Sequence, residues 1–173
     1  MPFSTGADVF QLDLTALRRG SFTVRRGLSA EDLQITPEDA SMAGSVEATL
    51  EVSLRGNRVL LRGALKGRIL APCRRCLEGL ERTVEAHVAL AYRLAAGVVG
   101  GPLPDGEEPG TDEVEDEDQT VEIPGHANLT PGLRDCFLLQ IPDRPLCRED
   151  CRGLCPRCGT NLNLNDCGCP ERT

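Results

Sequence analysis

A dense group of cysteines near the C-terminal end constrains this chain more than any other feature. Six of its nine cysteines lie within residues 147–169, separated by three, three, two, eight and one residues. The middle of this stretch, Cys155-Pro-Arg-Cys158-Gly159, has the sequence of a zinc knuckle, in which two thiolates point at one ion and the glycine permits a positive φ. We therefore predict a closed, structural zinc site within a C-terminal segment of residues 143–173.

The complete set of ligands is less determined. The two cysteines of the knuckle are the firm pair, and one tetrahedral zinc ion takes two more. The other two ligands could be Cys167 and Cys169, across the loop of residues 159–166, or Cys147 and Cys151, from the N-terminal side. Because six thiolates exceed what one ion binds, we favour a single ion with two spare cysteines.

A second C-x-x-C pair, Cys73 and Cys76, lies far from the others in the sequence. A thioredoxin-like redox pair needs a βαβ context, whereas here one predicted strand leads in and an antiparallel strand leads out. A structural role or shared metal binding is therefore the better interpretation. If the pair joins the six C-terminal cysteines, eight ligands become available for two ions, and this alternative stays open.

Disulfides are the main alternative explanation for so many cysteines, and they are typical of small secreted domains. Residues 1–20 contain no apolar run of signal-peptide length. No stretch approaches the 18 apolar residues that suggest a membrane span. We therefore expect a cytoplasmic protein without membrane segments, in which thiols stay reduced and bind metal.

Alternating apolar and polar residues predict an antiparallel sheet within residues 1–94. The alternation is strongest over 46–54, continues after a Gly56-Asn57 turn over 58–71, and returns over 84–94. Shorter strands are predicted over 9–14 and 21–26. Since the apolar side chains of each long segment share one face, the pattern is typical of a β-meander with one buried face.

The remainder of the chain completes this domain. Residues 95–118 are predicted to be a flexible linker, rich in Gly and Pro and then acidic, with nine acidic residues and no basic one over 105–118. Residues 119–142 should add a strand and a helix, with Thr130 as N-cap, Pro131 at the first helical position and Pro142 after the end. The predicted fold class is α+β: an antiparallel meander packed by one helix, with a C-terminal zinc knuckle.

Basic residues are concentrated in the second long strand and just after it. Residues 55–75 contain seven basic residues and no acidic one. Alternate strand positions share a face, so these side chains should project together, and RNA phosphate is their natural ligand. The alternative is a solvated face that glutamates of the neighbouring strands neutralise. The predicted RNA-binding residues are Arg58, Arg62, Lys66, Arg68, Arg74 and Arg75.

Several motifs together suggest a family. Cys-Arg-Arg-Cys-Leu follows the long hairpin at 73–77, Leu-Thr-Pro-Gly-Leu-Arg begins the helix at 129–134, and Gly-Leu-Cys-Pro-Arg-Cys-Gly-Thr-Asn-Leu-Asn at 153–163 precedes Cys-Gly-Cys at 167–169. From about residue 9 onward the chain resembles the YceD family of large ribosomal RNA subunit accumulation proteins. The resemblance implies a bacterial or plastid protein needed for large-subunit ribosomal RNA to accumulate or be processed, and it offers no established catalytic residues.

We therefore predict a non-catalytic factor for the accumulation, processing or assembly of large-subunit ribosomal RNA, with RNA or a pre-ribosomal particle as its partner. The chain has no phosphate-binding loop, nucleophile elbow or metalloprotease motif. An all-cysteine site also lacks the open coordination position that catalysis by zinc requires. The alternative is a protein–protein adaptor whose zinc end binds a ribosomal protein or a ribonuclease.

Overall fold

The computed structural model describes residues 11–13, 21–55, 58–94, 119–121 and 126–169. Within them lie one helix and two sheets, one of six strands and one of two. The strands are β1 (Gln11–Asp13), β2 (Phe22–Leu28), β3 (Ser41–Met42), β4 (Val46–Arg55), β5 (Arg58–Pro72), β6 (Gly79–Leu94), β7 (Gln119–Val121) and β8 (His126–Asn128), and the helix is α2 (Thr130–Leu138). The predicted linker of residues 95–118 and the Gly56-Asn57 turn lie outside the described residues.

The larger sheet has the strand order β2-β4-β5-β6-β7, and β3 pairs with β5 beside this path. Its centre is the predicted meander, in which β4, β5 and β6 are antiparallel. The longest pair is β5 with β6, whose residues pair without interruption from Arg58↔Arg93 to Pro72↔Gly79. The fold class is thus confirmed. The edge strand β7 runs parallel to β6, and the small sheet pairs β1 with β8. Neither of these pairings was predicted.

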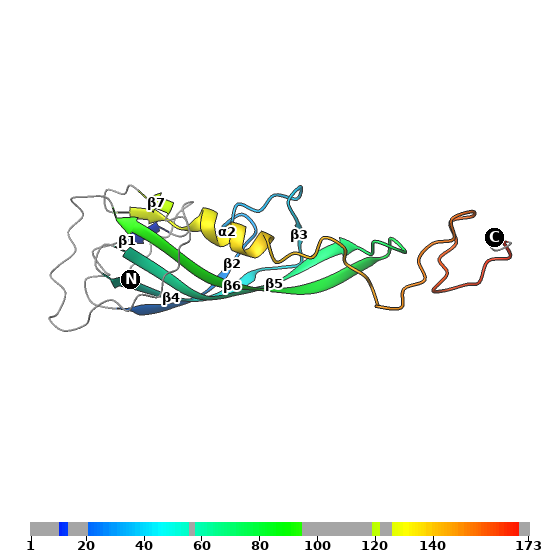
Figure 1. Ribbon diagram of the computed structural model, residues 1–173, viewed down its shortest axis with the longest axis horizontal. Coiled ribbons are helices and arrows are strands. Elements are labelled where there is room, and N and C mark those ends of the chain that lie inside the picture. Colours follow the sequence, from blue (N-terminus) through cyan, green and yellow to red (C-terminus); the bar gives the residue numbers. More distant parts are fainter. Residues whose placement is uncertain (1–10, 14–20, 56–57, 95–118, 122–125, 170–173) are drawn as a thin grey trace.

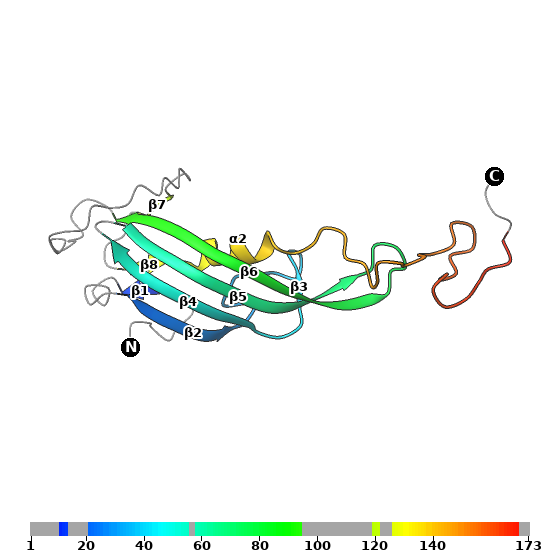
Figure 2. The ribbon, with the colours of Figure 1, turned by 60° about the horizontal axis from the view of Figure 1, so that its bottom comes forward.

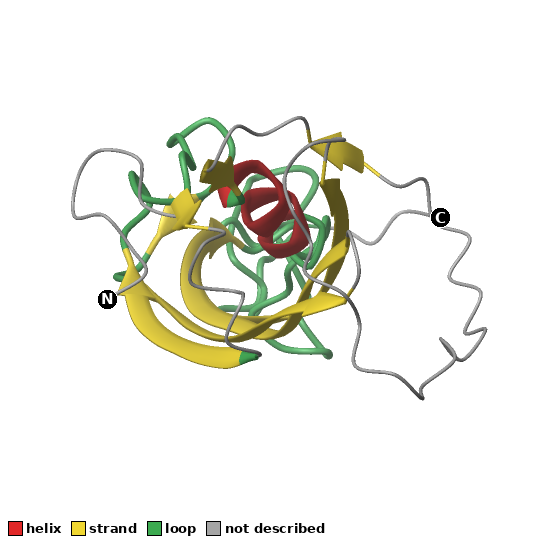
Figure 3. Ribbon diagram, turned by 90° about the vertical axis from the view of Figure 1, so that its left-hand side faces the viewer, coloured by secondary structure: helices red, strands yellow, loops and turns green. Residues whose placement is uncertain are grey.

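One face of the sheet forms the hydrophobic core with helix α2. Seen along the strands, the sheet curves around the helix (Figure 3). Leu61 and Leu65 of β5 and Leu133 and Phe137 of α2 are fully buried in this core. The Phe137 ring lies directly over the backbone of Gly67, where a Cβ atom would come within 3.0 Å of ring atom Cζ. Glycine at this position therefore permits the close approach of helix and sheet.

The helix begins differently from the prediction. Leu129, not Thr130, is the N-cap residue, and Thr130 is the first helical residue with 2% of its surface exposed. The Thr130 backbone N–H donates to Asn128 Oδ1 over 3.0 Å. The Asn128 side chain thus accepts from an N–H at the start of the helix, which the Thr130 hydroxyl was expected to do. Pro131 is accordingly the second helical residue and not the first, but it still lies in the first turn, where its missing N–H needs no partner.

The β5–β6 hairpin extends beyond the part of the sheet that the helix covers (Figures 1 and 2). The segment of residues 143–169 lies at that far end, next to the hairpin tip, as the orange and red part of the ribbon (Figure 1). Backbone hydrogen bonds join the two, including one from the Arg74 N–H to the Pro145 carbonyl over 2.9 Å. Within the described residues, no helix has the length and apolar character needed to cross a membrane.

Candidate metal centre

Eight cysteines gather into two groups of four at this far end of the molecule. In each group the four sulfur atoms all lie within 4.8 Å of one another, and each group consists of cysteine alone. All nine cysteines of the chain are free thiols. The first cluster comprises Cys73, Cys76, Cys147 and Cys151, and the second cluster comprises Cys155, Cys158, Cys167 and Cys169.

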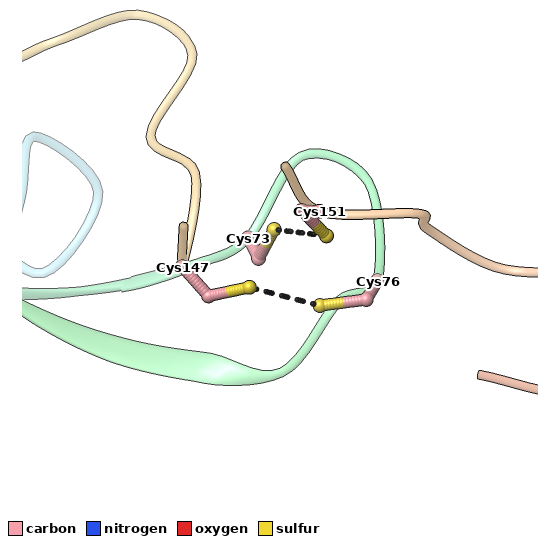
Figure 4. A group of neighbouring side chains, drawn as sticks. All are labelled: Cys73, Cys76, Cys147 and Cys151. Carbon is pink, nitrogen blue, oxygen red and sulfur yellow. Dashed lines mark hydrogen bonds between the residues drawn. The ribbon is translucent and has the colours of Figure 1, made fainter. Parts of the chain in front are cut away.

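The sulfur positions of the first cluster fit a single tetrahedral ion. Cys73 Sγ lies 3.7 Å from Cys151 Sγ, and Cys76 Sγ lies 3.6 Å from Cys147 Sγ (Figure 4). Four sulfurs at about 2.3 Å from a central zinc ion are separated by about 3.8 Å along each edge of the tetrahedron. The first cluster therefore has the spacing of a four-thiolate site for one metal ion.

The knuckle of the second cluster has the conformation that its sequence predicted. The Gly159 N–H donates to the Cys155 carbonyl over 2.9 Å, and the Cys155 N–H donates to the Thr160 carbonyl over 2.8 Å. Gly159 has a φ of 74°, in the left-handed region. Because glycine has no Cβ, it adopts this conformation at little cost and turns the chain back over the two sulfurs.

The Cys73–Cys76 turn of the first cluster is a second knuckle with the same hydrogen bonds. The Leu77 N–H donates to the Cys73 carbonyl over 2.9 Å, and the Cys73 N–H donates to the Glu78 carbonyl over 2.8 Å. Leu77 occupies the position of the knuckle glycine with a φ of 62°. A left-handed conformation costs a residue with a Cβ about 1–2 kcal/mol. Leucine in place of glycine is why the sequence indicated this knuckle only weakly.

Hydrogen bonds within the two turns favour the thiolate form of the first cysteine in each knuckle. A backbone hydrogen bond from Cys76 lowers the pKa of the Cys73 thiol to about 6, and one from Cys158 lowers the pKa of Cys155 to about 6. Partial desolvation, together with hydrogen bonds to the neighbouring thiols of the cluster, raises the pKa of the exposed Cys147 thiol to about 12. Since the thiolate is the metal ligand, the first cysteine of each knuckle is prepared to bind metal at neutral pH.

The first cluster joins two parts of the chain that are distant in sequence. Besides the sulfurs, the Arg75 guanidinium donates to the Cys151 carbonyl over 2.9 Å, and the Leu154 N–H donates to the Arg75 carbonyl over 3.1 Å. Three of its thiols, those of Cys73, Cys76 and Cys151, form a small buried core of their own with neighbouring leucines. Cys147, the fourth thiol, is exposed, and four thiolates would fill all positions of a tetrahedral ion, as in structural zinc sites.

The predicted ligands fall into an arrangement that the sequence left open only as an alternative. All six C-terminal cysteines belong to clusters, with Cys167 and Cys169 completing the knuckle of the second one. Cys147 and Cys151 are not spare thiols, because they combine with the hairpin-tip pair. The structure thus groups eight cysteines into two sets of four that could each hold one metal ion, as in the alternative that the sequence left open.

Acidic residues lie on the same sheet face as the predicted RNA-binding strand residues. Lys66 of β5 is paired in register with Glu47 on β4 and with Glu85 on β6. Arg62 is paired in register with Glu51. Directly opposite residues on neighbouring strands share a face, so each of these two basic side chains has a carboxylate neighbour.

The other predicted basic residues lie in mixed surroundings. Arg68 forms an ion pair with Glu81 at 2.6 Å between Nη1 and Oε1, and Arg58 is exposed near the opposite end of β5. Arg74 and Arg75 lie in the knuckle turn, where both donate to backbone carbonyls of the 143–169 segment. The outer face of the sheet thus carries Arg58, Arg62, Lys66 and Arg68. Arg74 and Arg75 instead join the knuckle turn of the first cluster to the 143–169 segment.

Comparison with known proteins places this architecture in a family. The family described as "Large ribosomal RNA subunit accumulation protein YceD" matches residues 61–173, which include both clusters. An uncharacterized protein of Mycobacterium tuberculosis is 32% identical over 120 residues, covering 66% of this chain and 52% of the relative. One from Mycobacterium leprae is 29% identical over 119 residues, covering 68% and 49%.

A plant relative carries the family's name. The chloroplastic large ribosomal RNA subunit accumulation protein YCED homolog 1 of Arabidopsis thaliana is 23% identical over 162 residues, covering 84% of this chain and 50% of the relative. The chain thus spans about half the length of these curated relatives. No solved structure matches it significantly. On the match of the family over residues 61–173, this chain belongs to the YceD family, whose name implies a role in the accumulation of large-subunit ribosomal RNA.

Proposed function

We propose that this chain is a non-catalytic factor for the accumulation, processing or assembly of large-subunit ribosomal RNA, and that each cluster holds one structural zinc ion. The observation that carries the proposal is the pair of closed, all-thiol clusters at the far end of the β5–β6 hairpin, within the region that matches the family. Closed four-cysteine sites stabilise a fold and leave no coordination position for a substrate.

The composition and spacing of the clusters support zinc. Tetrahedral sites made only of sulfur select zinc or iron over magnesium, calcium and manganese, which prefer oxygen ligands. Sulfur separations of 3.6 and 3.7 Å suit one zinc ion in the first cluster. When bound, zinc would join the hairpin tip to residues 143–169, and Cys73, Cys76, Cys147 and Cys151 would hold it there.

The location of the clusters suggests what they stabilise. None of the eight ligand cysteines belongs to the main core, which is formed by the sheet and helix α2. We name the knuckle turn of residues 73–78 together with residues 143–169 the zinc end. Its metal would therefore order a surface that is distant from the core, and we propose that this surface contacts the pre-ribosomal particle.

Metal removal tests this division of the molecule. A chelator should leave the far-ultraviolet circular dichroism of the sheet nearly unchanged, because the main core contains no ligand. The zinc end should become sensitive to trypsin, which cleaves after exposed arginines such as Arg148 and Arg152. Loss of the sheet signal on chelation would contradict the separation of core and clusters, and metal analysis of reduced protein that finds no zinc would contradict zinc binding.

Sedimentation with ribosomal precursors tests the function. On a gradient, the wild-type chain should cofractionate with large-subunit precursors, and Cys73→Ser and Cys155→Ser should reduce this by disordering the zinc end. Cys136→Ser is the matched control, since Cys136 packs against the main core outside both clusters. A wild-type chain absent from these fractions would refute the function, and undiminished cofractionation of both cluster variants would refute the zinc end as the contact surface.

A second candidate function, a protein–protein adaptor, is favoured by the acidic residues beside the basic strand face. Phosphate binding predicts that replacing Arg62, Lys66 and Arg68 by glutamine weakens RNA binding and reduces its salt slope by about one per lost contact. Replacing Glu47 and Glu51 by glutamine should strengthen RNA binding on the same hypothesis, because it removes like-charged neighbours of the phosphate. If neither change alters RNA affinity in folded protein, the adaptor is the better description.

A further inference from the structure

The loop between two ligands of the second cluster contacts a ligand of the first cluster. This loop comprises residues 159–166 and is bounded by Cys158 and Cys167. Within it, the Asn163 side-chain amide donates a hydrogen bond from Nδ2 to Cys151 Sγ over 3.3 Å. A side chain positioned by one cluster thereby supplies a hydrogen bond to a sulfur of the other.

Further hydrogen bonds fix the orientation of the Asn163 amide. Its Oδ1 atom accepts from the Arg152 backbone N–H over 2.8 Å and from the Arg148 guanidinium over 2.9 Å. Its Nδ2 atom also donates to Asn161 Oδ1 over 2.9 Å. Because two donors, the Arg152 N–H and the Arg148 guanidinium, lie on one side of the amide, Oδ1 must face them. The NH₂ group therefore faces the sulfur.

Asn161, in the same loop, contacts the chain next to the Cys73–Cys76 knuckle of the first cluster. The Asn161 amide donates to Glu78 Oε1 over 2.9 Å, and Glu78 lies two residues after Cys76. The Leu162 N–H donates to the Gly153 carbonyl over 2.9 Å, between the two clusters in sequence. The loop of the second cluster is therefore in contact with both halves of the first one.

We propose that Asn163 couples metal binding at the two clusters, so that filling the second cluster raises the affinity of the first. This inference rests on the proposed metal binding. A hydrogen bond to a ligand atom orients the ligand and stabilises its charge, and loss of such a partner costs about 10–100-fold in metal affinity. The donor is in place only when the loop is ordered, and metal at Cys158 and Cys167 would fix both ends of that loop. Coupling of binding affinities is reciprocal, so the first cluster favours filling of the second by the same factor.

The distribution of bound zinc measures this coupling. Native mass spectrometry of the reduced, metal-free full chain with one equivalent of Zn²⁺ separates empty, singly loaded and doubly loaded protein. If the two sites have equal intrinsic affinities, a tenfold coupling lowers the singly loaded fraction from about one half to about one quarter. We expect this depletion in the wild-type chain.

Asn163→Asp is the informative variant, because it keeps the acceptor atom for Arg148 and Arg152 and removes the donor to the sulfur, together with the one to Asn161 Oδ1. It should restore the singly loaded species to about one half or more. Asn165→Asp makes the same chemical change in the same loop, at a side chain without these contacts, and should behave as wild type. An Asn163→Asp variant with wild-type populations would overturn the coupling while zinc binding stands. A wild-type chain that binds no zinc would overturn both.

A second measurement needs no change at Asn163. Cys158→Ser with Cys169→Ser disables the second cluster and leaves the four ligands of the first one intact. Titration with Co²⁺, followed by thiolate-to-cobalt absorption, should then show an affinity about fivefold weaker than that of the intact chain for its second ion, because the statistical factor for two sites halves a tenfold coupling. Equal affinities would overturn the proposal, and circular dichroism of the sheet verifies that each variant is folded.

Discussion

Gly159→Ala tests whether backbone conformation in the knuckle determines metal affinity. Gly159 has a φ of 74°, and a Cβ atom built there would meet no atom within 4 Å. The substitution therefore adds left-handed strain without a steric clash, at a cost of about 1–2 kcal/mol. The reduced freedom of the unfolded chain offsets about 0.4–1 kcal/mol of this cost. The net loss is about 1 kcal/mol, which corresponds to about fivefold weaker zinc binding.

Gly168→Ala is the matched control for this substitution. Gly168 lies in the same cluster between two ligands, and a Cβ atom there would also meet nothing within 4 Å, but its φ is outside the left-handed region. Competition of the reduced chain with a chromophoric chelator measures zinc affinity for both variants. We expect Gly159→Ala to bind zinc more weakly than wild type and Gly168→Ala to bind it equally well or slightly better. Equal affinities of the two variants would refute the strain argument.

Two further predictions concern the sheet domain. Phe137→Ala should lower the free energy of unfolding by about 3–5 kcal/mol in a denaturant titration, because it empties a fully buried site; Leu139→Ala, at a side chain 82% exposed, should change it by less than about 0.5 kcal/mol. Hydrogen bonds from Thr36 and Arg134 lower the pKa of Asp39 from 3.8 to about 2. Its carboxylate therefore stabilises the fold fully above the unfolded pKa, and this contribution is lost as the pH falls from about 4 to 2. Asp39→Asn should accordingly melt below wild type at neutral pH, and a gap in melting temperature that persists at pH 2 would contradict this assignment.

The long strands could be predicted from the sequence because burial of one face imposes a period of two on their residues. Val59, Leu61 and Leu65 are buried, whereas Arg62 and Lys66 of the same strand are exposed, as the alternation indicated. The segments predicted as strands over 9–14 and within 119–142 contain the three-residue strands β1 and β7, whereas β8 was not predicted. Their pairing depends on which distant segments meet at the sheet edges, and local sequence does not encode that.

The division of the cysteines into clusters was hidden for a related reason. Spacing within residues 147–169 is local and indicates ligands, but it does not indicate that Cys147 lies next to Cys76, 71 residues earlier. The glycine that marks one knuckle is replaced by Leu77 in the other, so the shared turn was visible only in the backbone conformation. Asn163 gave no signal at all, because its role depends on the contact between the two clusters.

The wide separation of ligands in the first cluster has a consequence for the order of events during translation. Cys73 and Cys151 are 78 residues apart, so at about 5–20 residues per second the ribosome adds the second about 4–16 s after the first. The hairpin-tip thiols spend that interval as an incomplete half-site. The four ligands of the second cluster, within residues 155–169, are synthesised in about 1–3 s. Cys169 follows Cys151 by only 18 residues, so both clusters become complete within a few seconds of each other.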